Sequence, residues 1–411
     1  MPQLSKKRIL IVCQHFWPES FRINDIADFL TENDYEVEVL CGLPNYPKGQ
    51  LYDGYSLFGK RTEKHNNIII HRTLEIPRGN NTNLRIFLNY ISFPIFSLLK
   101  LPKLLLNKYD KIFIYQLSPV MMSLAGILLG KIKRVETTMY VLDLWPENLY
   151  SVLDIKSGVL RSLATKVSHW HYRKVDKLIT LSDRMRSRLI EATVIQSERI
   201  IVLPQACEKI YETDIHDSSL ASRFKDRFTI LFTGNISPAQ SFETILGAAE
   251  ILRDKGLHDI TWIIVGDGMS RLWLEDQVRR RDLTSYFSFE GQKPIEDIPR
   301  YTHLASVLVG CLVKSDLLEA TIPAKVMSYI AAGRPIVLAM DGEVQTLIND
   351  TIQCGYAGPT EDPEALAANI QKIYALSKQQ RNELGKRGKS YHLKHFERNI
   401  ILKKLTQFIF S

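Results

Sequence analysis

Short apolar runs alternate with amphipathic segments through the first half of the chain, and this alternation narrows the folds it can adopt. The runs lie at 8–13, 35–41, 68–72, 111–115, 135–142 and 177–181. Strands joined by helices form a parallel sheet covered on both faces, and ligands bind at the carboxyl ends of its strands. The pattern therefore predicts an α/β fold built on a parallel sheet.

A chain of 411 residues is too long for one ordinary core. We place a first domain at 1–205, a polar linker at 206–227 and a second domain at 228–390. The second domain opens on a new strand, a glycine turn and a helix, and a final segment with helical spacing occupies 391–411. With 45% hydrophobic and 24% charged residues, the composition is that of a globular protein.

The N-terminus and the cysteines indicate the cellular compartment of the chain. The first apolar run is too short for a signal peptide and fits a buried strand better. The five cysteines are scattered and form no C-x-x-C pair. We therefore expect buried free thiols in a reducing cytoplasm and no metal site.

Positive charge is concentrated in the first half of the chain. Residues 1–200 hold 28 Lys and Arg against 19 Asp and Glu. Such a surplus suits nucleic acid, an anionic membrane surface or a phosphorylated substrate. The sequence has no zinc finger, helix-turn-helix or RNA-binding aromatic motif, so nucleic acid ranks last among these partners.

The stretch from Gly310 to Glu343 is the plainest candidate binding segment. A buried strand ends near Leu312 and an acidic loop follows it. Thr321 as a capping residue and Pro323 in the first turn predict the start of a helix, which should end at Gly333. A second apolar strand follows. The segment thus predicts a strand, a loop, a helix and a strand.

Lys325 falls in the first turn of this helix, with Ser328 and Tyr329 on the same face. The free amides of a helix start and an ammonium group aimed at one spot suit an anion, most naturally a phosphate. A solvated surface lysine is the alternative. The helix dipole disfavours a lysine in the first turn, so its presence there needs another reason.

The pattern P-x-K-x-x-x-Y-x-A-x-G-x-P-I at 323–336, followed by D-G-E at 341–343, resembles the donor-site motif of the retaining GT-B glycosyltransferases of family four. The subgroup it most resembles contains bacterial N-acetyl-L-fucosamine transferases of O-antigen and colanic acid assembly. The resemblance implies two Rossmann-like domains with parallel sheets facing a cleft, and a C-terminal helix that crosses back onto the first domain. It extends from Arg8 to about Phe396.

The resemblance also implies roles for single residues of this segment. The motif lysine of the family binds the donor diphosphate, which maps onto Lys325. The family's pair of glutamates falls on Ser328 and Ala320, with Glu319 one position away, so the ribose contact stays unassigned. The donor-side residues expected here are Glu319, Thr321, Lys325, Ser328 and Glu343.

Two glycine loops should complete the donor side. One follows the first strand of the second domain, and its helix is expected to start at Ser237 and Pro238. The other follows the next strand and resembles the family's donor loop, although G-D-G alone usually marks a turn. Their residues are Gly234 and Asn235 in the first loop, with Gln240 nearby, and Gly266, Asp267 and Gly268 in the second.

Two loops of the first domain are candidates for the acceptor side. The loop after the first strand offers His15 and Arg22 as acceptor-side candidates. Arg22 could reach an acceptor phosphate, while Ser20 could cap the next helix. A structural loop plugged by apolar side chains is the alternative. The segment 42–55 contains Asn45 and Tyr46 and resembles an acceptor loop of the subgroup, although turn formation explains it equally well.

Asp143 stands where the strand at 135–142 opens, in the segment D-L-W-P-E. The same segment occurs in the subgroup, whereas many family members have a histidine there. A carboxylate at this place could accept the proton of an acceptor hydroxyl. Alternatively, Asp143 caps the following helix.

The segment Leu84–Leu106 is the most hydrophobic of the chain, but prolines and basic residues interrupt it. It fits a membrane-spanning helix poorly and an interfacial helix on anionic lipid better. An ordinary buried helix is the alternative. A lipid-linked acceptor, as the resemblance implies, favours the interfacial helix.

The resemblance implies a retaining glycosyltransferase that moves a sugar, expected to be UDP-linked, to a lipid-linked or oligosaccharide acceptor in bacterial surface polysaccharide synthesis. We expect no metal and no cofactor, and a cytoplasmic location at the inner face of the cell membrane. Two alternatives stay open. One is a nucleotide-sugar epimerase of the same fold, and the other is an inactive scaffold subunit, which the missing ribose glutamate would fit.

Overall fold

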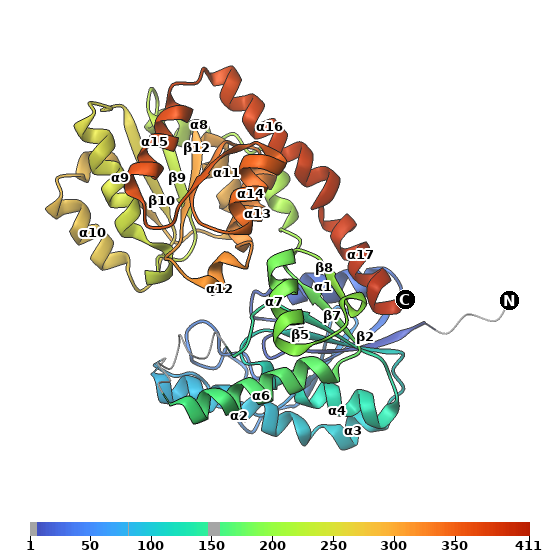
Figure 1. Ribbon diagram of the computed structural model, residues 1–411. Helices are drawn as coiled ribbons and strands as arrows, with labels where there is room; N and C mark the ends of the chain where they lie inside the picture. Colours follow the sequence, from blue (N-terminus) through green and yellow to red (C-terminus); the bar gives the residue numbers. More distant parts are fainter. Residues whose placement is uncertain (1–5, 81, 147–156) are drawn as a thin grey trace. The chain divides into compact units, whose positions relative to one another are not determined.

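The computed structural model describes residues 6–80, 82–146 and 157–411, and it divides into two compact units (Figure 1). Unit 1 comprises Met1–Leu203 and Leu402–Ser411, and unit 2 comprises Pro204–Ile401. The stretch 206–227, expected as a linker, contains the short helices η3 (Lys209–Glu212) and α8 (Ser218–Arg223) and lies within unit 2. Each unit is built on its own sheet, as the sequence pattern predicts.

Unit 1 contains an eight-stranded sheet in the order β3-β4-β2-β1-β5-β6-β7-β8. All neighbouring strands are parallel except β3 and β4, which are antiparallel. The strands are β1 (Arg8–Val12), β2 (Glu36–Cys41), β3 (Thr62–His65), β4 (Ile68–Arg72), β5 (Lys111–Gln116), β6 (Thr137–Val141), β7 (Lys177–Thr180) and β8 (Ile200–Val202). The central strands are almost wholly buried because helices cover both faces of the sheet.

The helices of unit 1 fall into two groups. α2, α3, α4 and α6 lie together on one side of the sheet and α1 lies on the other (Figure 1). The helices are α1 (Arg22–Glu32), α2 (Asn83–Leu98), α3 (Leu101–Leu105), η1 (Val120–Ser123), α4 (Leu124–Lys133), α6 (Gly158–Lys174), α7 (Asp183–Thr193) and η2 (Ser197–Arg199). The hydrophobic segment at 84–106 therefore forms two helices rather than one.

Unit 2 contains a six-stranded parallel sheet in the order β11-β10-β9-β12-β13-β14. The strands are β9 (Phe228–Thr233), β10 (Ile260–Val265), β11 (Phe287–Gly291), β12 (Val307–Cys311), β13 (Ile336–Ala339) and β14 (Gly355–Gly358). β9 and β10 are fully buried runs of apolar and β-branched residues, which is typical of central parallel strands. Two parallel-sheet, Rossmann-like units confirm the predicted fold class.

The helices of unit 2 cover both faces of its sheet, and α16 leads to the last helix of the chain (Figure 1). They are η3 (Lys209–Glu212), α8 (Ser218–Arg223), η4 (Pro238–Gln240), α9 (Phe242–Asp254), α10 (Arg271–Arg280), η5 (Thr284–Tyr286), η6 (Ile295–Asp297), α11 (Ile298–Leu304), α12 (Asp316–Glu319), α13 (Ala324–Ala332), α14 (Glu343–Thr346), η7 (Leu347–Ile352), α15 (Pro363–Tyr374) and α16 (Lys378–His395). The last helix, α17 (Arg398–Phe410), begins in unit 2 and ends in unit 1, where Phe410 stacks on Tyr35 with ring centroids 4.5 Å apart.

All five cysteines are buried and none forms a disulfide, as predicted. Within the described ranges, no helix combines the length and the apolar content needed to cross a membrane. The same residues contain no group of three or more His, Cys, Asp or Glu that could hold a metal ion.

Candidate functional site

α13 places Lys325 at its second residue, beside the carboxyl end of β12. The helix ends at Gly333, as predicted, because Gly333 takes the left-handed conformation (φ 68°). The predicted cap is wrong. Pro323 occupies the N-cap position, and the Thr321 hydroxyl donates to the Leu318 carbonyl of the preceding turn instead. No capping side chain therefore occupies the start of α13.

The ammonium group of Lys325 points back into unit 2 rather than into bulk water. It donates to Oε1 of Gln240 and lies 4.0 Å from the centroid of the Phe232 ring. A Cβ atom on Gly234 would stand 3.5 Å from it. Burial lowers the pKa of Lys325 to about 7. In the described part of the chain, no carboxylate lies within ion-pair distance of it, so the charged form lacks a counter-ion.

Tyr329, one turn further along α13, fixes this arrangement. Its hydroxyl accepts from the Thr233 amide (2.9 Å) and donates to the Val309 carbonyl (3.2 Å). Burial raises its pKa to about 12, so the hydroxyl stays protonated. The side chain thereby ties α13 to the ends of β9 and β12, and it holds Lys325 beside Gly234.

The two glycine loops lie against each other at the carboxyl ends of β9 and β10. Gly234 has φ 134° and its amide donates to the Val265 carbonyl (3.0 Å). A Cβ atom on Gly266, which has φ 149°, would come within 1.9 Å of the Gly234 carbonyl oxygen. Only glycine permits this approach. Next to it, Asn235 Oδ1 would lie 2.4 Å from a Cβ atom on Gly268.

The remaining donor-side candidates differ in their accessibility. Asp267 is exposed, accepts from its neighbour's amide and pairs with Arg271 (3.4 Å). Ser328 is buried and its hydroxyl donates to the Ala324 carbonyl (3.3 Å), so it faces the helix and not a ligand. Glu319 ends the short helix α12, where an open loop was expected, and Glu343 begins α14.

Glu319 and Glu343 lie close along the backbone. A Cβ atom on Gly342, which has φ 88°, would stand 2.2 Å from the Glu319 carbonyl oxygen. Glu343, the next residue, therefore starts its helix against the end of α12. The structure thus brings Lys325, Gly234, Gly266 and Gly268 to one edge of the unit 2 sheet, with Glu319 and Glu343 after its neighbouring strands.

In unit 1, Glu19 organises the two predicted acceptor loops. Its carboxylate contacts His15 Nδ1 (3.1 Å) and accepts from the Asn45 (2.8 Å) and Tyr46 (2.7 Å) amides. The His15 ring stacks on Phe21 at 4.9 Å and lies 5.5 Å from the Tyr46 ring. His15, Asn45 and Tyr46 therefore form one cluster, and Glu19, which the sequence analysis did not single out, holds them together.

The structure of the loop after β1 corrects the predicted helix cap and places Arg22 at the start of α1. α1 begins at Arg22 with Phe21 as its N-cap residue, and no side chain caps it, so Ser20 is not the predicted cap. Arg22 is only part-exposed at the helix start. Phe16 is buried, which supports the structural role considered for this loop.

Asp143 lies two residues beyond β6. Its Oδ2 accepts from the Ser118 hydroxyl (2.9 Å), which in turn accepts from Trp145 Nε1 (2.9 Å). Residues 144–146 are not helical, so the alternative that Asp143 caps a helix depends on the residues beyond them. The rest of the segment that follows it, 147–156, lies outside the described residues.

Arg78 is a candidate that the sequence analysis missed. Its guanidinium lies 5.3 Å from the Tyr46 ring and 5.5 Å from the Tyr90 ring. Burial raises the pKa of Tyr90, Arg78 lowers it, and Asp143 and Tyr46 raise it further. Asp143, Tyr46 and Arg78 are therefore electrostatic neighbours around one tyrosine. No sequence motif marks Arg78, because it follows its strand by several residues.

The family model and the curated relative that resemble this chain are both described as glycosyltransferases. Residues 227–375 match the family model described as "Glycosyl transferases group 1". The chain is 25% identical over 387 residues to the "Putative colanic acid biosynthesis glycosyl transferase WcaI" of Escherichia coli K12, covering 90% of this chain and 93% of that protein. At this level the sequence likeness supports a glycosyltransferase.

Solved structures share the fold over the whole chain. The crystal structure of Anabaena Alr3699/HepE in complex with UDP and glucose superposes with a TM-score of 0.70 at 14% identity, covering 98% of both chains. WaaG, described as a glycosyltransferase involved in lipopolysaccharide biosynthesis, gives 0.68 at 14% identity, covering 98% of this chain and 99% of WaaG. The architecture is the GT-B fold.

Proposed function

We propose that this chain, whose second unit matches the group 1 glycosyltransferases, transfers a sugar from a UDP-linked donor to a lipid-linked or oligosaccharide acceptor in bacterial surface polysaccharide synthesis. We assign it to family four, with retention of configuration, and to the fucosamine transferase subgroup. Its likeness to WcaI, WaaG and the UDP complex of HepE supports the assignment.

The position of Lys325 carries this proposal. Its ammonium group has no counter-ion among the described residues and lies at the start of a helix with free amides. The glycine loops beside it allow close backbone approach. This combination is suited to binding a diphosphate. We place the sugar or the ribose against Glu343 at the start of α14 and Glu319 after β12. This edge of unit 2 is our donor site, and it requires no metal ion.

We propose that the sugar is transferred by attack on its front face. The bond between the anomeric carbon and the diphosphate oxygen breaks as the acceptor oxygen bonds to the same carbon. The acceptor proton passes to Asp143 or to the leaving diphosphate, and Lys325 and the α13 amides stabilise the charge that grows on that diphosphate. We place the acceptor at the cluster of His15, Asn45, Tyr46 and Arg78.

The depressed pKa of Lys325 predicts how donor binding depends on pH. A bound diphosphate raises the pKa of the lysine, so a UDP-sugar binds with uptake of a proton above about pH 7. Affinity should fall as pH rises from about 7 to about 8.5, by up to about tenfold per pH unit. Calorimetry in buffers of different ionisation enthalpy measures this uptake. Constant affinity without proton uptake would contradict a lysine that is half neutral before binding.

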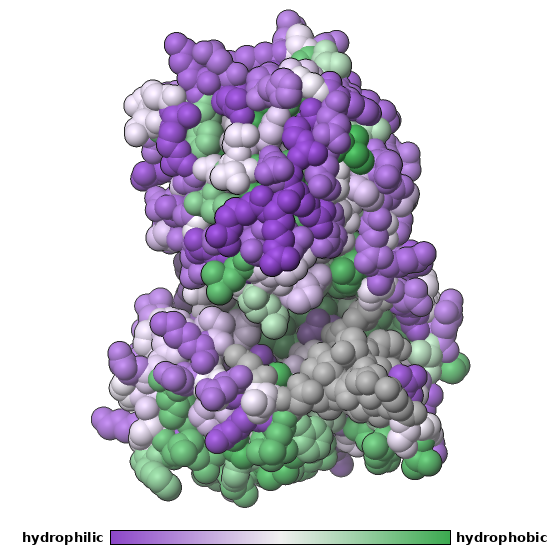
Figure 2. Space-filling view, turned by 90° about the vertical axis from the view of Figure 1, so that its left-hand side faces the viewer, coloured by the Kyte–Doolittle hydropathy of each residue, from purple (hydrophilic) through white to green (hydrophobic). Residues whose placement is uncertain are grey.

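A membrane surface is the partner that we propose for unit 1. Figure 2 shows apolar residues gathered on the part of unit 1 where α2 and α6 lie in Figure 1. The strongly exposed ones include Leu84 (67%), Leu99 (70%) and Leu106 (85%), with Val159 (80%) on α6. Other residues of the same helices, such as Phe93, are buried, so α2 has one packed and one open side.

Basic residues accompany this exposed apolar surface. Burial lowers the pKa of Lys100, and the neighbouring Lys103 and Arg61 lower it further, so three cations lie close together next to Leu99. An apolar surface flanked by cations fits the headgroups and outer acyl region of anionic lipid. A chain bound to the membrane through this surface would reach a lipid-linked acceptor.

Anionic vesicles should therefore bind the full chain at low salt and release it as salt rises. The triple variant Leu84→Ser, Leu99→Ser, Leu106→Ser should bind more weakly. Met269→Ser with Leu272→Ser, equally exposed apolar residues of unit 2, serves as the control. If the wild type stays in the supernatant when anionic vesicles are sedimented, the membrane proposal is wrong.

Two experiments separate this function from its alternatives. A scaffold subunit would bind no nucleotide sugar, so saturable binding of a UDP-sugar in a calorimeter argues against that alternative. An epimerase would convert the donor without an acceptor, so a coupled assay lacking acceptor should show no conversion. Absence of donor binding would overturn the proposed function.

A further inference from the structure

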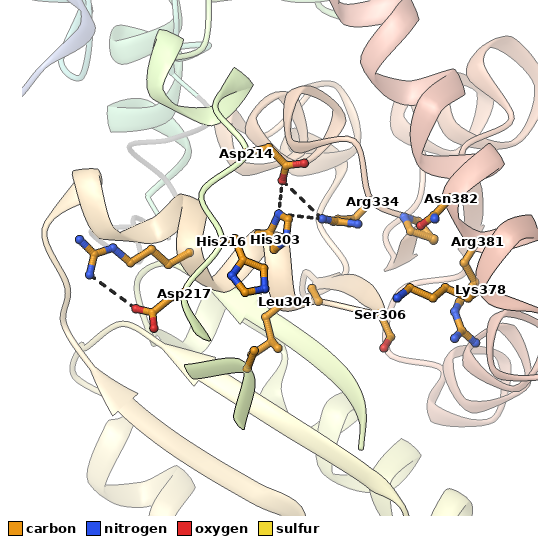
Figure 3. A pocket seen from close by; sticks show the side chains of 14 residues that line it. Asp214, His216, Asp217, His303, Leu304, Ser306, Arg334, Lys378, Arg381 and Asn382 are labelled. Atoms are coloured by element: carbon orange, nitrogen blue, oxygen red, sulfur yellow. Dashed lines mark hydrogen bonds and ion pairs between the residues drawn. The ribbon is translucent and has the colours of Figure 1, made fainter. Parts of the chain in front are cut away.

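A cavity of about 430 Å³ opens on unit 2 at the edge opposite the donor loops (Figure 3). It is lined by Ala305 and Ser306, which directly precede β12, and by Pro335, which directly precedes β13. These are the amino ends of parallel strands, whereas Lys325 and Gly234 follow the carboxyl ends. The cavity is therefore a separate site, and its volume lies in the range of small-molecule pockets, roughly 300–1000 Å³.

Basic side chains outnumber acidic ones in this cavity. Both carboxylates already have partners. Asp214 contacts His303 and Arg334 (3.4 Å), as Figure 3 shows. Asp217 lies 3.6 Å from Arg300 and also accepts from the first turn of α8. The acidic groups of the cavity are thus neutralised by the basic groups on their own side of it.

Lys378 and Arg381, on the first turns of α16, are the remaining cations. Within residues 6–80, 82–146 and 157–411, neither has a carboxylate at ion-pair distance. Arg381 donates to the Leu376 carbonyl (2.8 Å) and lies over the Phe228 ring, and burial lowers its pKa. In Figure 3 both side chains lie on the side of the cavity where Ser306 stands. Arg381 is part-buried, whereas Lys378 is exposed. A partly buried cation such as Arg381 is costly without a counter-charge, and an anion would relieve that cost.

We propose that this cavity binds a small phosphorylated metabolite, with its phosphate on Lys378 and Arg381 and its organic part against Ser306, Leu304 and His216. Two uncompensated positive charges match a phosphate dianion, and the fork of an arginine suits two of its oxygens. The volume exceeds what an oxyanion alone needs. This binding site is independent of the proposed transfer reaction.

Calorimetry with the full chain tests the proposal using a hexose 6-phosphate, inorganic phosphate and the unphosphorylated hexose as probes. The hexose phosphate should bind saturably and more tightly than inorganic phosphate, and the hexose should not bind. Lys378→Gln combined with Arg381→Gln should weaken binding by about tenfold or more. Lys386→Gln with Lys394→Gln removes two exposed charges from the same helix outside the cavity and should leave affinity unchanged.

Because Arg381 packs on Phe228, the double variant could lose stability for a structural reason. The single variant Lys378→Gln alters only an exposed side chain, and it should weaken binding without lowering the unfolding temperature. The proposal is overturned if the hexose phosphate does not bind, if inorganic phosphate binds equally well, or if the double variant keeps wild-type affinity. It is also overturned if Lys325→Ala abolishes the binding, because the ligand would then occupy the donor site.

Discussion

Replacing Asp143 by Asn should slow sugar transfer by about 10²–10⁴-fold, the range that proton-transfer assistance supplies. The amide keeps the shape of the side chain and can still accept from the Ser118 hydroxyl, but it can no longer take a proton. Affinity for a UDP-sugar should barely change, since Asp143 belongs to unit 1 and the donor residues belong to unit 2. Single-turnover transfer and donor calorimetry measure the two effects separately.

A matched control lies at the other end of the same strand. Asp176 accepts from the amide (2.7 Å) and hydroxyl (2.8 Å) of Thr137, the first residue of β6. Asp176→Asn should cost some stability and leave transfer by the folded enzyme unchanged. If Asp143→Asn transfers sugar at the wild-type rate, the diphosphate alone removes the proton, and Asp143 has no catalytic role.

Replacing Lys325 by Ala should cost about 2–4 kcal/mol of transition-state stabilisation, the range for one preorganised group that stabilises developing charge. The rate should fall most in the chemical step, because charge on the diphosphate grows as the sugar leaves. The variant should still fold. Burial already disfavours the charged form of Lys325, so removing the ammonium group removes an unfavourable buried charge.

Lys372→Ala is the control for this second variant. Lys372 lies 4.9 Å from the Tyr356 ring centroid, much as Lys325 lies over Phe232, but it stands on α15. Both variants lose a lysine packed on an aromatic ring, and only Lys325→Ala should lose activity. Turnover of Lys325→Ala within about threefold of the wild type would remove Lys325 from the site, since that is far below the loss expected for such a group.

Periodicity predicted the central strands well. β1 was expected at 8–13 and occupies Arg8–Val12, because a buried central strand is a nearly continuous apolar run. Among the edge strands, β3 and β14 were missed. β3 is the polar sequence Thr62–His65, and β14 is Gly355–Gly358, with two glycines, so neither carries an apolar signal. Each of these strands forms because it pairs with a neighbouring strand, and a local sequence pattern does not reveal that pairing.

Helix starts were the weaker part of the prediction. Ser20, Ser237 and Thr321 are good capping residues, yet none makes a side-chain capping hydrogen bond to the helix that follows it. After β9 a 3₁₀ turn at Pro238–Gln240 delays α9 to Phe242, and this turn brings Gln240 to the ammonium of Lys325. Tertiary contacts of the loops outweigh capping preferences at these positions.

The site was predictable where it follows a motif and unpredictable where it depends on packing. The motif located Lys325 at the start of a helix, and the glycine loops were expected beside it. No sequence pattern indicates that the ammonium is buried over Phe232, or that Glu19 and Arg78 join the acceptor cluster. These contacts join residues far apart in the chain, and their side chains have no shared spacing.

Transfer of labelled sugar from UDP-, GDP- and dTDP-linked donors to a membrane extract by the purified chain tests the proposed function most directly. We expect a UDP-sugar to label a lipid-extractable product with unchanged anomeric configuration. Lys325→Ala and Asp143→Asn should lose this labelling, whereas Lys372→Ala and Asp176→Asn should keep it. Binding of a UDP-sugar without transfer to any acceptor in the extract, or a product with inverted configuration, would contradict the proposed function.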